Sequence, residues 1–261
     1  MSVVFAVLAL LAPPAPDSPL PVRAAAIAQT LEQTTTQLHA AVASWQTGPR
    51  AGGATPREVT LWGLHQQRLF LKLTYDAPLG RQARPLLSRE ARATLDARRR
   101  LVSLTPPTTL PLSAFRTGPA LPARTLLRFY REAERRFGVE WEVLAAVNFV
   151  ETGFNRLRSR SSAGAQGPMQ FMPATWRAYG LGGDVHEPRD AILGAANYLR
   201  ASGAARDLRR ALFAYNHSTR YVDAVAAFAA QLRRDERIFF AYHSWQVFVK
   251  TPAGPRRLTG P

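Results

Sequence analysis

Apolar residues in the first part of the chain recur at three- and four-residue steps, which is the pattern of amphipathic helices. Three segments carry it, namely residues 22–45, 57–76 and 86–104. In the first segment Ile27, Leu31, Leu38 and Val42 lie among threonines and glutamines. Such stripes are usually packing surfaces, and this half lacks the residue types of a catalytic centre. We therefore expect a helical annex over residues 22–104.

The pattern stops where proline becomes frequent. Residues 105–122 contain five prolines, each of which removes an amide donor and fixes φ. A regular helix or a central strand is unfavourable in such a stretch. We expect residues 105–122 to be a linker between the annex and a second domain over residues 123–235.

Helix signals are dense in that second domain. An apolar stripe that starts at Leu126 stops at Gly138, and Glu140 and Glu142 open the next helix at its positive end. Further helices are predicted over residues 173–179, 190–202, 205–216 and 218–234. Residues 236–261 are aromatic and β-branched and contain P-A-G-P, which predicts a C-terminal aromatic tail with a short strand or hairpin. The fold class is mainly α.

Charge and cysteine content narrow the classes of partner. The formal charge of +16 indicates an anionic partner, which is nucleic acid, an acidic membrane face or an anionic cell wall. The arginines are spread along the chain, whereas nucleic-acid binders concentrate them on one element, so no nucleic acid is expected. Without cysteine there are no disulfides or thiolate nucleophiles. The five histidines show no zinc spacing, and we expect neither metal nor cofactor.

The N-terminus reads M-S-V-V-F-A-V-L-A-L-L-A before Pro13 and Pro14. This apolar run is too short to cross a bilayer but has the length of a signal-peptide core. Against that interpretation, no basic residue precedes Arg23, so a frayed apolar terminus of a cytosolic protein is the alternative. We expect residues 1–21 to be a signal peptide and the protein to be exported, extracellular or associated with the cell wall.

Glu151 is the first candidate for chemistry. It ends the apolar segment W-E-V-L-A-A-V-N-F-V, just before a loop rich in glycine and serine. Partial burial against Val147, Val150 or Phe154 would raise its pKa and keep it protonated near neutral pH, as a general acid requires. Taken alone, a glutamate at this position is more often a solvated charge at a helix end.

Two later segments have residue types suited to a sugar ligand. Residues 161–170 read S-S-A-G-A-Q-G-P-M-Q, where two glycines permit tight turns and Gln170 offers both a donor and an acceptor. The A-Y-N triplet at Ala214, Tyr215 and Asn216 adds an aromatic ring and an amide. Separately, these residues are also typical of a loop, a core methionine and a helix cap.

Together, four ordered blocks resemble the soluble lytic transglycosylase (SLT) family, which has a goose-type lysozyme-like fold. They are E-T-G-F-N, G-A-Q-G-P-M-Q-F-M-P-A-T-W, D-A-I-L-G-A-A-N-Y-L and A-L-F-A-Y-N-H-S-T-R-Y-V, over roughly residues 124–230. The resemblance implies a lysozyme-like domain over residues 123–235 with Glu151 as the catalytic acid/base. It also implies substrate binding by Thr152, Ser161, Gln170, Met172, Tyr198, Tyr215 and Asn216.

The implied reaction is cleavage of the MurNAc–GlcNAc β-1,4 bond of peptidoglycan with formation of 1,6-anhydro-muramic acid. No Asp or Glu occurs between Glu151 and Asp184, which favours a single-acid mechanism over a two-carboxylate mechanism. A hydrolytic muramidase and a non-catalytic wall-binding protein are the alternatives. The basic loop with Arg156, Arg158 and Arg160 either meets wall carboxylates or is solvated. We expect a monomer whose partners are peptidoglycan glycan strands and the anionic wall surface.

Overall fold

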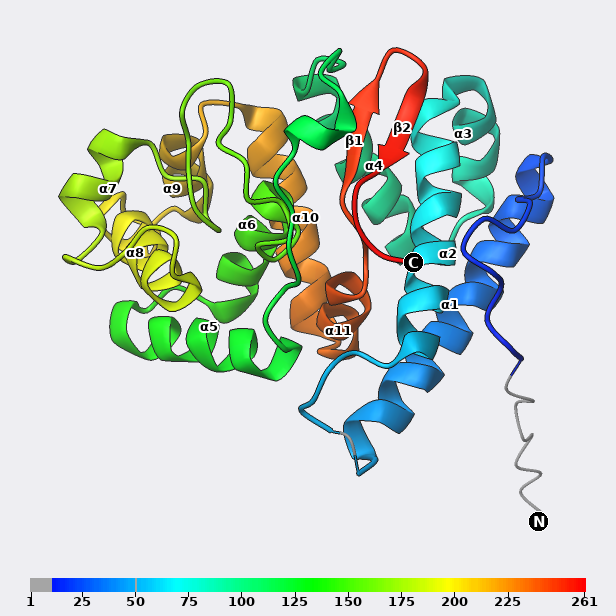
Figure 1. Cartoon of the computed structure of the whole chain (residues 1–261), viewed down its shortest axis with the longest axis horizontal. Coiled ribbons are helices and arrows are strands. Elements are labelled where there is room, and N and C mark those ends of the chain that lie inside the picture. Colours follow the sequence, from blue (N-terminus) through cyan, green and yellow to red (C-terminus); the bar gives the residue numbers. More distant parts are fainter. Residues whose placement is uncertain (1–10, 50) are drawn as a thin grey trace.

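A computed structural model describes residues 11–49 and 51–261 of the chain (Figure 1). Within these ranges helices make up most of the structure, and one short antiparallel hairpin follows them, so the predicted mainly α fold class is confirmed. The annex contains α1 (Ala24–Thr47), α2 (Arg57–Tyr75), α3 (Ala77–Ala83), η1 (Arg84–Leu86) and α4 (Arg89–Leu104). The rest of the chain contains η2 (Leu112–Ala114), α5 (Ala123–Phe137), α6 (Trp141–Thr152), α7 (Pro173–Tyr179), α8 (Pro188–Ala201), α9 (Leu208–Tyr215), α10 (Thr219–Arg234), α11 (Arg237–His243), β1 (Phe248–Thr251) and β2 (Gly254–Arg257).

The three helices predicted in the annex correspond to α1, α2 and α4. The short helix α3 was not predicted. It starts directly after α2 because the Asp76 side chain accepts a hydrogen bond from the Leu79 amide at 3.0 Å, and Pro78 occupies the first turn. Seven residues are too few to show a helical period in the sequence.

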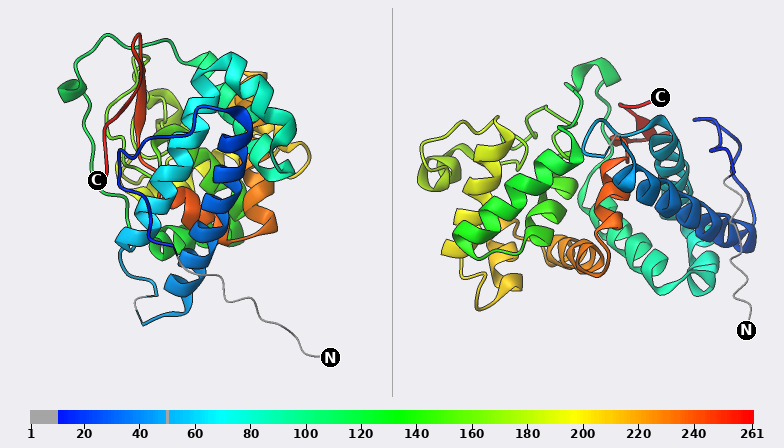
Figure 2. Two further views of the ribbon diagram at one scale, coloured as in Figure 1. Left: turned by 90° about the vertical axis from the view of Figure 1, so that its right-hand side faces the viewer. Right: turned by 90° about the horizontal axis from the view of Figure 1, so that it is seen from below.

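The annex and the second half of the chain share one continuous apolar core. Helix α4 lies along α10, and α1 contacts α11. Figure 2 shows α10 and α11 between the annex helices on one side and α5 to α9 on the other. Inside the α4–α10 contact the Thr94 hydroxyl donates to Gln231 at 3.0 Å, and the Tyr242 hydroxyl donates to the same Gln231 oxygen at 3.0 Å.

The proline-rich stretch, residues 105–122, contains only the single turn η2. Three of its amides nevertheless have partners in distant segments: Thr108 donates to the Lys250 carbonyl at 2.8 Å, Arg116 to the Ser159 hydroxyl at 2.8 Å, and Gly118 to the Arg156 carbonyl at 3.0 Å. The stretch is therefore fastened to the hairpin and to the loop after α6.

The C-terminal hairpin is confirmed, but the aromatic tail predicted over residues 236–261 is wrong for its first part. Residues 237–243 form the helix α11, which buries Phe239, Phe240 and Tyr242. Edge-on ring contacts hold it between two parts of the chain, Phe240 with Trp45 of α1 and Phe239 with Tyr130 of α5. Tertiary packing of the rings thus outweighs the strand preference of the aromatic residues.

Most of the apolar run that we predicted as a signal-peptide core, residues 1–10, lies outside the described residues. The described residues 11–22 lack helix and strand. Within them, the Ser18 carbonyl accepts a hydrogen bond from Arg68 of α2 at 2.9 Å. None of the described helices is both long enough and apolar enough to cross a membrane.

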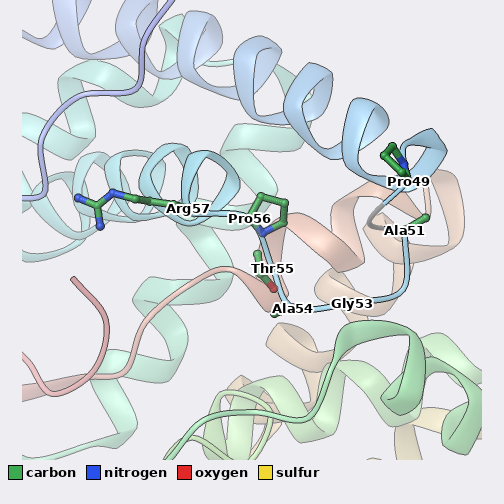
Figure 3. A pocket seen from close by; sticks show the side chains of 7 residues that line it. All are labelled: Pro49, Ala51, Gly53, Ala54, Thr55, Pro56 and Arg57. Carbon is green, nitrogen blue, oxygen red and sulfur yellow. The ribbon is translucent and has the colours of Figure 1, made fainter.

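A shallow hollow lies at the connection between α1 and α2 (Figure 3). Of the described residues that line it, only Arg57 is charged, and its side chain points along α2 and away from the connection. The hollow therefore brings no set of reactive side chains together.

Candidate active site

Glu151 lies in the last turn of α6, one residue before the helix ends at Thr152. The helix stops because Gly153 adopts a left-handed conformation, with φ of 57°, and its amide donates to the Phe149 carbonyl at 3.0 Å. A side chain with a Cβ would be strained in this conformation. The glycine therefore fixes the end of the helix and, with it, the position of Glu151.

The carboxyl group of Glu151 has a single described hydrogen-bond partner. Tyr221, near the start of α10, donates its hydroxyl proton to Oε1 at 2.7 Å. Burial raises the pKa of Glu151 to about 7, although the hydrogen bond from Tyr221 acts in the opposite direction. Near neutral pH the group is thus close to half protonated, and it can give up a proton and take one back.

Tyr221 was not singled out from the sequence. It lies in the last of the four blocks, and the Ser218 side chain that caps α10 accepts a hydrogen bond from the Tyr221 amide. Its phenol ring is buried and lies beside Glu151, whose charge helps to raise the pKa of Tyr221. The position inside a recognised block was the only available signal, since its partner is 70 residues away.

Thr152, which we predicted to contact glycan, is held by hydrogen bonds inside the domain. Its side chain is 2% exposed, and its hydroxyl donates to the Pro168 carbonyl at 2.7 Å and accepts from the Asn155 amide at 2.9 Å. Asn148 also donates to the Pro168 carbonyl, at 2.8 Å. These bonds fasten the loop of residues 161–172 to the end of α6, next to Glu151.

The three loop residues predicted to bind substrate lie at different places. Ser161 is exposed, and its side chain closes a turn by accepting from the Ala165 amide at 3.0 Å. Gln170 has a positive φ of 50° and donates to the Gly167 carbonyl at 3.0 Å. Met172 is 44% exposed at the start of α7. Ser161 and Met172 thus have side chains within reach of an outside ligand.

The two predicted tyrosines form a cluster beside Glu151. Tyr215 donates to the Met169 carbonyl at 2.6 Å, and the charge of Glu151 contributes to raising the pKa of Tyr215 after burial. Tyr198 lies next to it, with ring centroids 5.7 Å apart, and donates to the Ala214 carbonyl at 2.9 Å. Asn216 is exposed at the end of α9. The structure therefore brings Tyr215 close to Glu151, with Tyr198 one ring further away.

A cavity of about 230 Å³ borders the end of α6. Its described walls come from α2, α4, the end of α6, α10 and the start of the hairpin. Glu151 is the only carboxylate among the described residues that line it. The annex, in which we predicted no catalytic residues, thus supplies part of the wall next to the candidate acid.

Two of the loop arginines, Arg156 and Arg158, form hydrogen bonds within the fold. Arg156 is buried and donates to the carbonyls of His243 and Gly153, and Arg158 donates to the Pro119 carbonyl at 3.0 Å. Arg160 remains a prediction for contact with the wall. In the described part of the chain no cluster of His, Asp or Glu has the arrangement of a metal site.

Comparison with known proteins finds a family that matches the region of the chain around Glu151. No solved structure matches the chain. Residues 128–237 match the family described as "Transglycosylase SLT domain", a range that runs from α5 to the first residue of α11 and includes Glu151 and Tyr221. The chain therefore contains a lysozyme-like domain of the SLT family, the family of peptidoglycan lytic transglycosylases, over residues 128–237.

Proposed function

We propose that the protein is an exported peptidoglycan lytic transglycosylase that cleaves the MurNAc–GlcNAc β-1,4 bond and leaves a 1,6-anhydro-muramic end. One observation carries the proposal: within the SLT domain, Glu151 ends α6 with a pKa raised to about 7 and with Tyr221 bonded to one of its oxygens. A carboxyl group of this pKa suits the acid step and the base step of one reaction.

In the first step, protonated Glu151 gives its proton to the leaving GlcNAc oxygen while the bond from that oxygen to C1 of MurNAc breaks. The carbonyl oxygen of the MurNAc N-acetyl group forms the new bond to C1, which gives a cyclic oxazolinium ion. The Tyr221 hydrogen bond stabilises the carboxylate that Glu151 leaves behind. The substrate itself supplies the nucleophile in this scheme.

In the second step, the Glu151 carboxylate removes the proton from the C6 hydroxyl of the same MurNAc. The C6 oxygen then bonds to C1, the C1–oxygen bond of the oxazolinium breaks, and the N-acetyl group is restored. Glu151 ends protonated, ready for the next cycle. A water molecule in place of the C6 hydroxyl would give hydrolysis.

The surroundings of Glu151 support a single-acid scheme. Two-carboxylate glycosidases hold their pair within about 5 to 9.5 Å. The described cavity wall beside Glu151 has no second carboxylate. The pKa of Glu151 is shifted by its burial and by the hydrogen bond from Tyr221. A substrate-derived nucleophile fits this environment better than a protein nucleophile.

Product analysis tests the proposal. Purified sacculi are digested with the protein, and the released muropeptides are identified by mass. Anhydro-muropeptides are expected. Exclusive release of reducing-end muropeptides would assign the protein as a muramidase, and release of neither would contradict an enzymatic role.

Substitution of Glu151 tests the residue assignment. Glu151→Gln keeps the shape and can still accept from Tyr221, but it has no titratable proton, so we expect a loss of roughly 10³-fold or more in turnover. Retention of full activity would remove Glu151 from the mechanism. Export is tested separately, by finding the protein in the cell-wall or extracellular fraction rather than the cytosol.

A further inference from the structure

A half-buried arginine on the annex has no acidic partner. Arg98 projects from α4 into the wall of the cavity that borders Glu151. Its Nε is buried without a hydrogen-bond partner, and within the described structure no carboxylate forms an ion pair with it. Removing a charged N–H from water without giving it an acceptor is unfavourable, so the position of Arg98 needs an explanation.

The groups around Arg98 keep it in place without neutralising it. Its guanidinium lies over the ring of Trp245, 5.1 Å from the centroid. Burial lowers the pKa of Arg98 to about 10, which leaves the side chain charged at neutral pH. Stacking of this kind fixes the position of the cation and leaves its donor edges available.

Arg156 provides the contrast within the same molecule. It is more deeply buried than Arg98, and its guanidinium donates to the His243 carbonyl at 2.6 Å and to the Gly153 carbonyl at 3.1 Å. A structural arginine in this protein therefore has acceptors in the fold. Arg98 has none of this kind among the described residues, so its terminal N–H groups are free to donate to an acceptor from outside the protein.

The other polar groups of the cavity wall are nearly all used within the protein. Gln67 donates to the Gln246 carbonyl at 2.7 Å and accepts from the Gln246 amide at 2.8 Å. The side chain of Gln246 donates to Ser244 and accepts from Thr259. In the described wall this leaves Arg98 and the Tyr75 hydroxyl as donors without a partner.

We propose that Arg98, with Tyr75, binds a carboxylate of the peptidoglycan substrate. The carboxylate belongs to the branch of the muramic acid, either its lactyl group or the stem peptide attached to it. This inference rests on the proposed function, because the branch sits on the same sugar ring whose bond would be cleaved beside Glu151. The cavity of about 230 Å³ has room for a short side branch rather than for a glycan strand.

The annex then selects the substrate. Glu151 performs the same chemistry on any muramic acid that reaches it, whereas Arg98 and Tyr75 favour chains with a carboxylate at the correct distance. Charge-assisted, bidentate hydrogen bonds give arginine this preference for carboxylates.

Three substrates test the proposal with Arg98→Gln. They are peptide-bearing glycan, glycan stripped of its peptides so that the lactyl carboxylate is free, and stripped glycan whose lactyl carboxylate has been converted to an amide. For a substrate with the recognised carboxylate we expect KM to rise roughly 10- to 100-fold. For the amidated glycan we expect little change.

The pattern of losses identifies the source of the carboxylate. A loss confined to peptide-bearing glycan assigns the stem peptide, and a loss confined to stripped glycan with the free acid assigns the lactyl group. Arg98→Lys keeps the charge and should recover part of the loss. An equal loss on all three substrates, or no loss on any, would overturn the proposal.

Arg100→Gln is the matched control, because Arg100 lies on the same helix and faces Asp223, 3.6 Å away, at the surface. It should leave KM unchanged on every substrate. Thermal unfolding of both variants shows whether they fold.

A binding measurement separates this proposal from the proposed function. Calorimetry with a disaccharide-tetrapeptide and with stripped disaccharide is carried out on Glu151→Gln and on the double variant with Arg98→Gln. A Kd that is roughly 10- to 100-fold weaker in the double variant, for one of the two probes, supports the carboxylate site even if cleavage is not found. Equal Kd values in the two proteins for both probes would contradict it.

Discussion

Glu151 couples the chemistry of the site to the stability of the fold. Its pKa is raised from its ordinary value of 4.5 to about 7 because burial disfavours the charged form. The stability associated with the neutral form is present below the unfolded pKa and is lost as pH rises through the folded value of about 7.

Glu151→Gln should therefore be more stable than the parent protein at pH 8 and nearly equal to it at pH 4. The raised pKa sets an upper limit of about 3 kcal/mol on the difference in the free energy of unfolding at pH 8. Urea unfolding at pH 4, 6 and 8 measures it. A difference that does not change with pH would show that the carboxyl group is not buried as described.

Tyr221 should tune the working pH of Glu151. Its hydrogen bond favours the carboxylate, so Tyr221→Phe removes an effect that lowers the pKa of Glu151. We expect the alkaline limb of the pH–activity profile on sacculi to move to higher pH, and the rate at the optimum to fall roughly 10-fold.

Tyr130→Phe is the control for that experiment. Tyr130 is also buried, but its hydroxyl donates to the Asn148 side chain at 2.6 Å, away from the carboxyl group. It should lower the melting temperature without shifting the alkaline limb. Equal shifts in the two variants would mean that Tyr221 acts only through packing.

Among the elements, the loop after α6 contains two glycines, Gly164 and Gly167, of which only Gly167 lies tightly against another segment. Gly164 and Gly167 both have a positive φ, of 89° and 76°. A Cβ at Gly164 would meet open space, whereas a Cβ at Gly167 would overlap the carbonyl oxygen of Val185. The loop is held against the segment before α8 at this point.

Gly167→Ala should therefore cost more stability and activity than Gly164→Ala. The strained φ alone costs about 1–2 kcal/mol and is common to both variants. We expect Gly167→Ala to lose clearly more than that because the loop that carries Gln170 and Met172 must move. Chemical unfolding and turnover on sacculi measure the two effects, and equal losses in both variants would contradict the close approach to Val185.

Sequence periodicity predicted the elements where one helical face is apolar. The helices α1, α2, α4, α5, α8 and α10 show such a stripe, and the ends of α5 and α6 are marked by Gly138 and Gly153. The helix α11 gave no such signal, because its rings are aromatic and buried by partners from α1 and α5. Its conformation depends on contacts that a single sequence does not contain.

The candidate site likewise contains residues that the sequence identified and contacts that it did not. The motif identified Glu151 and Tyr215, whose residue types suit their chemistry and whose neighbourhood the structure supports. It also included Thr152 among the substrate-binding residues, and the structure adds that the Thr152 hydroxyl bonds to a backbone carbonyl 16 residues further along the chain. Neither that carbonyl nor the Tyr221 contact is encoded in the local pattern.

For the whole molecule, the proline-rich stretch suggested a boundary, but the apolar core runs across it. The stripe on α4 shows that one face of this helix is buried, and it does not show that the partner is α10. The contribution of Arg98 to the cavity beside Glu151 follows from that same packing. An annex of this kind is part of the folding unit.

A single core predicts a single unfolding transition. Leu95 is fully buried on α4, so Leu95→Ala should cost about 2–5 kcal/mol. Leu104→Ala, at the end of the same helix where the side chain is 39% exposed, should cost much less.

Circular dichroism follows all helices, and tryptophan fluorescence follows all five tryptophans. Trp45 and Trp62 lie in the annex, Trp141 and Trp176 in the SLT domain, and Trp245 just before the hairpin. Both signals should shift by the same amount in Leu95→Ala. If the annex were independent, Leu95→Ala would instead split the transition, with the annex unfolding first and the SLT domain keeping its original midpoint.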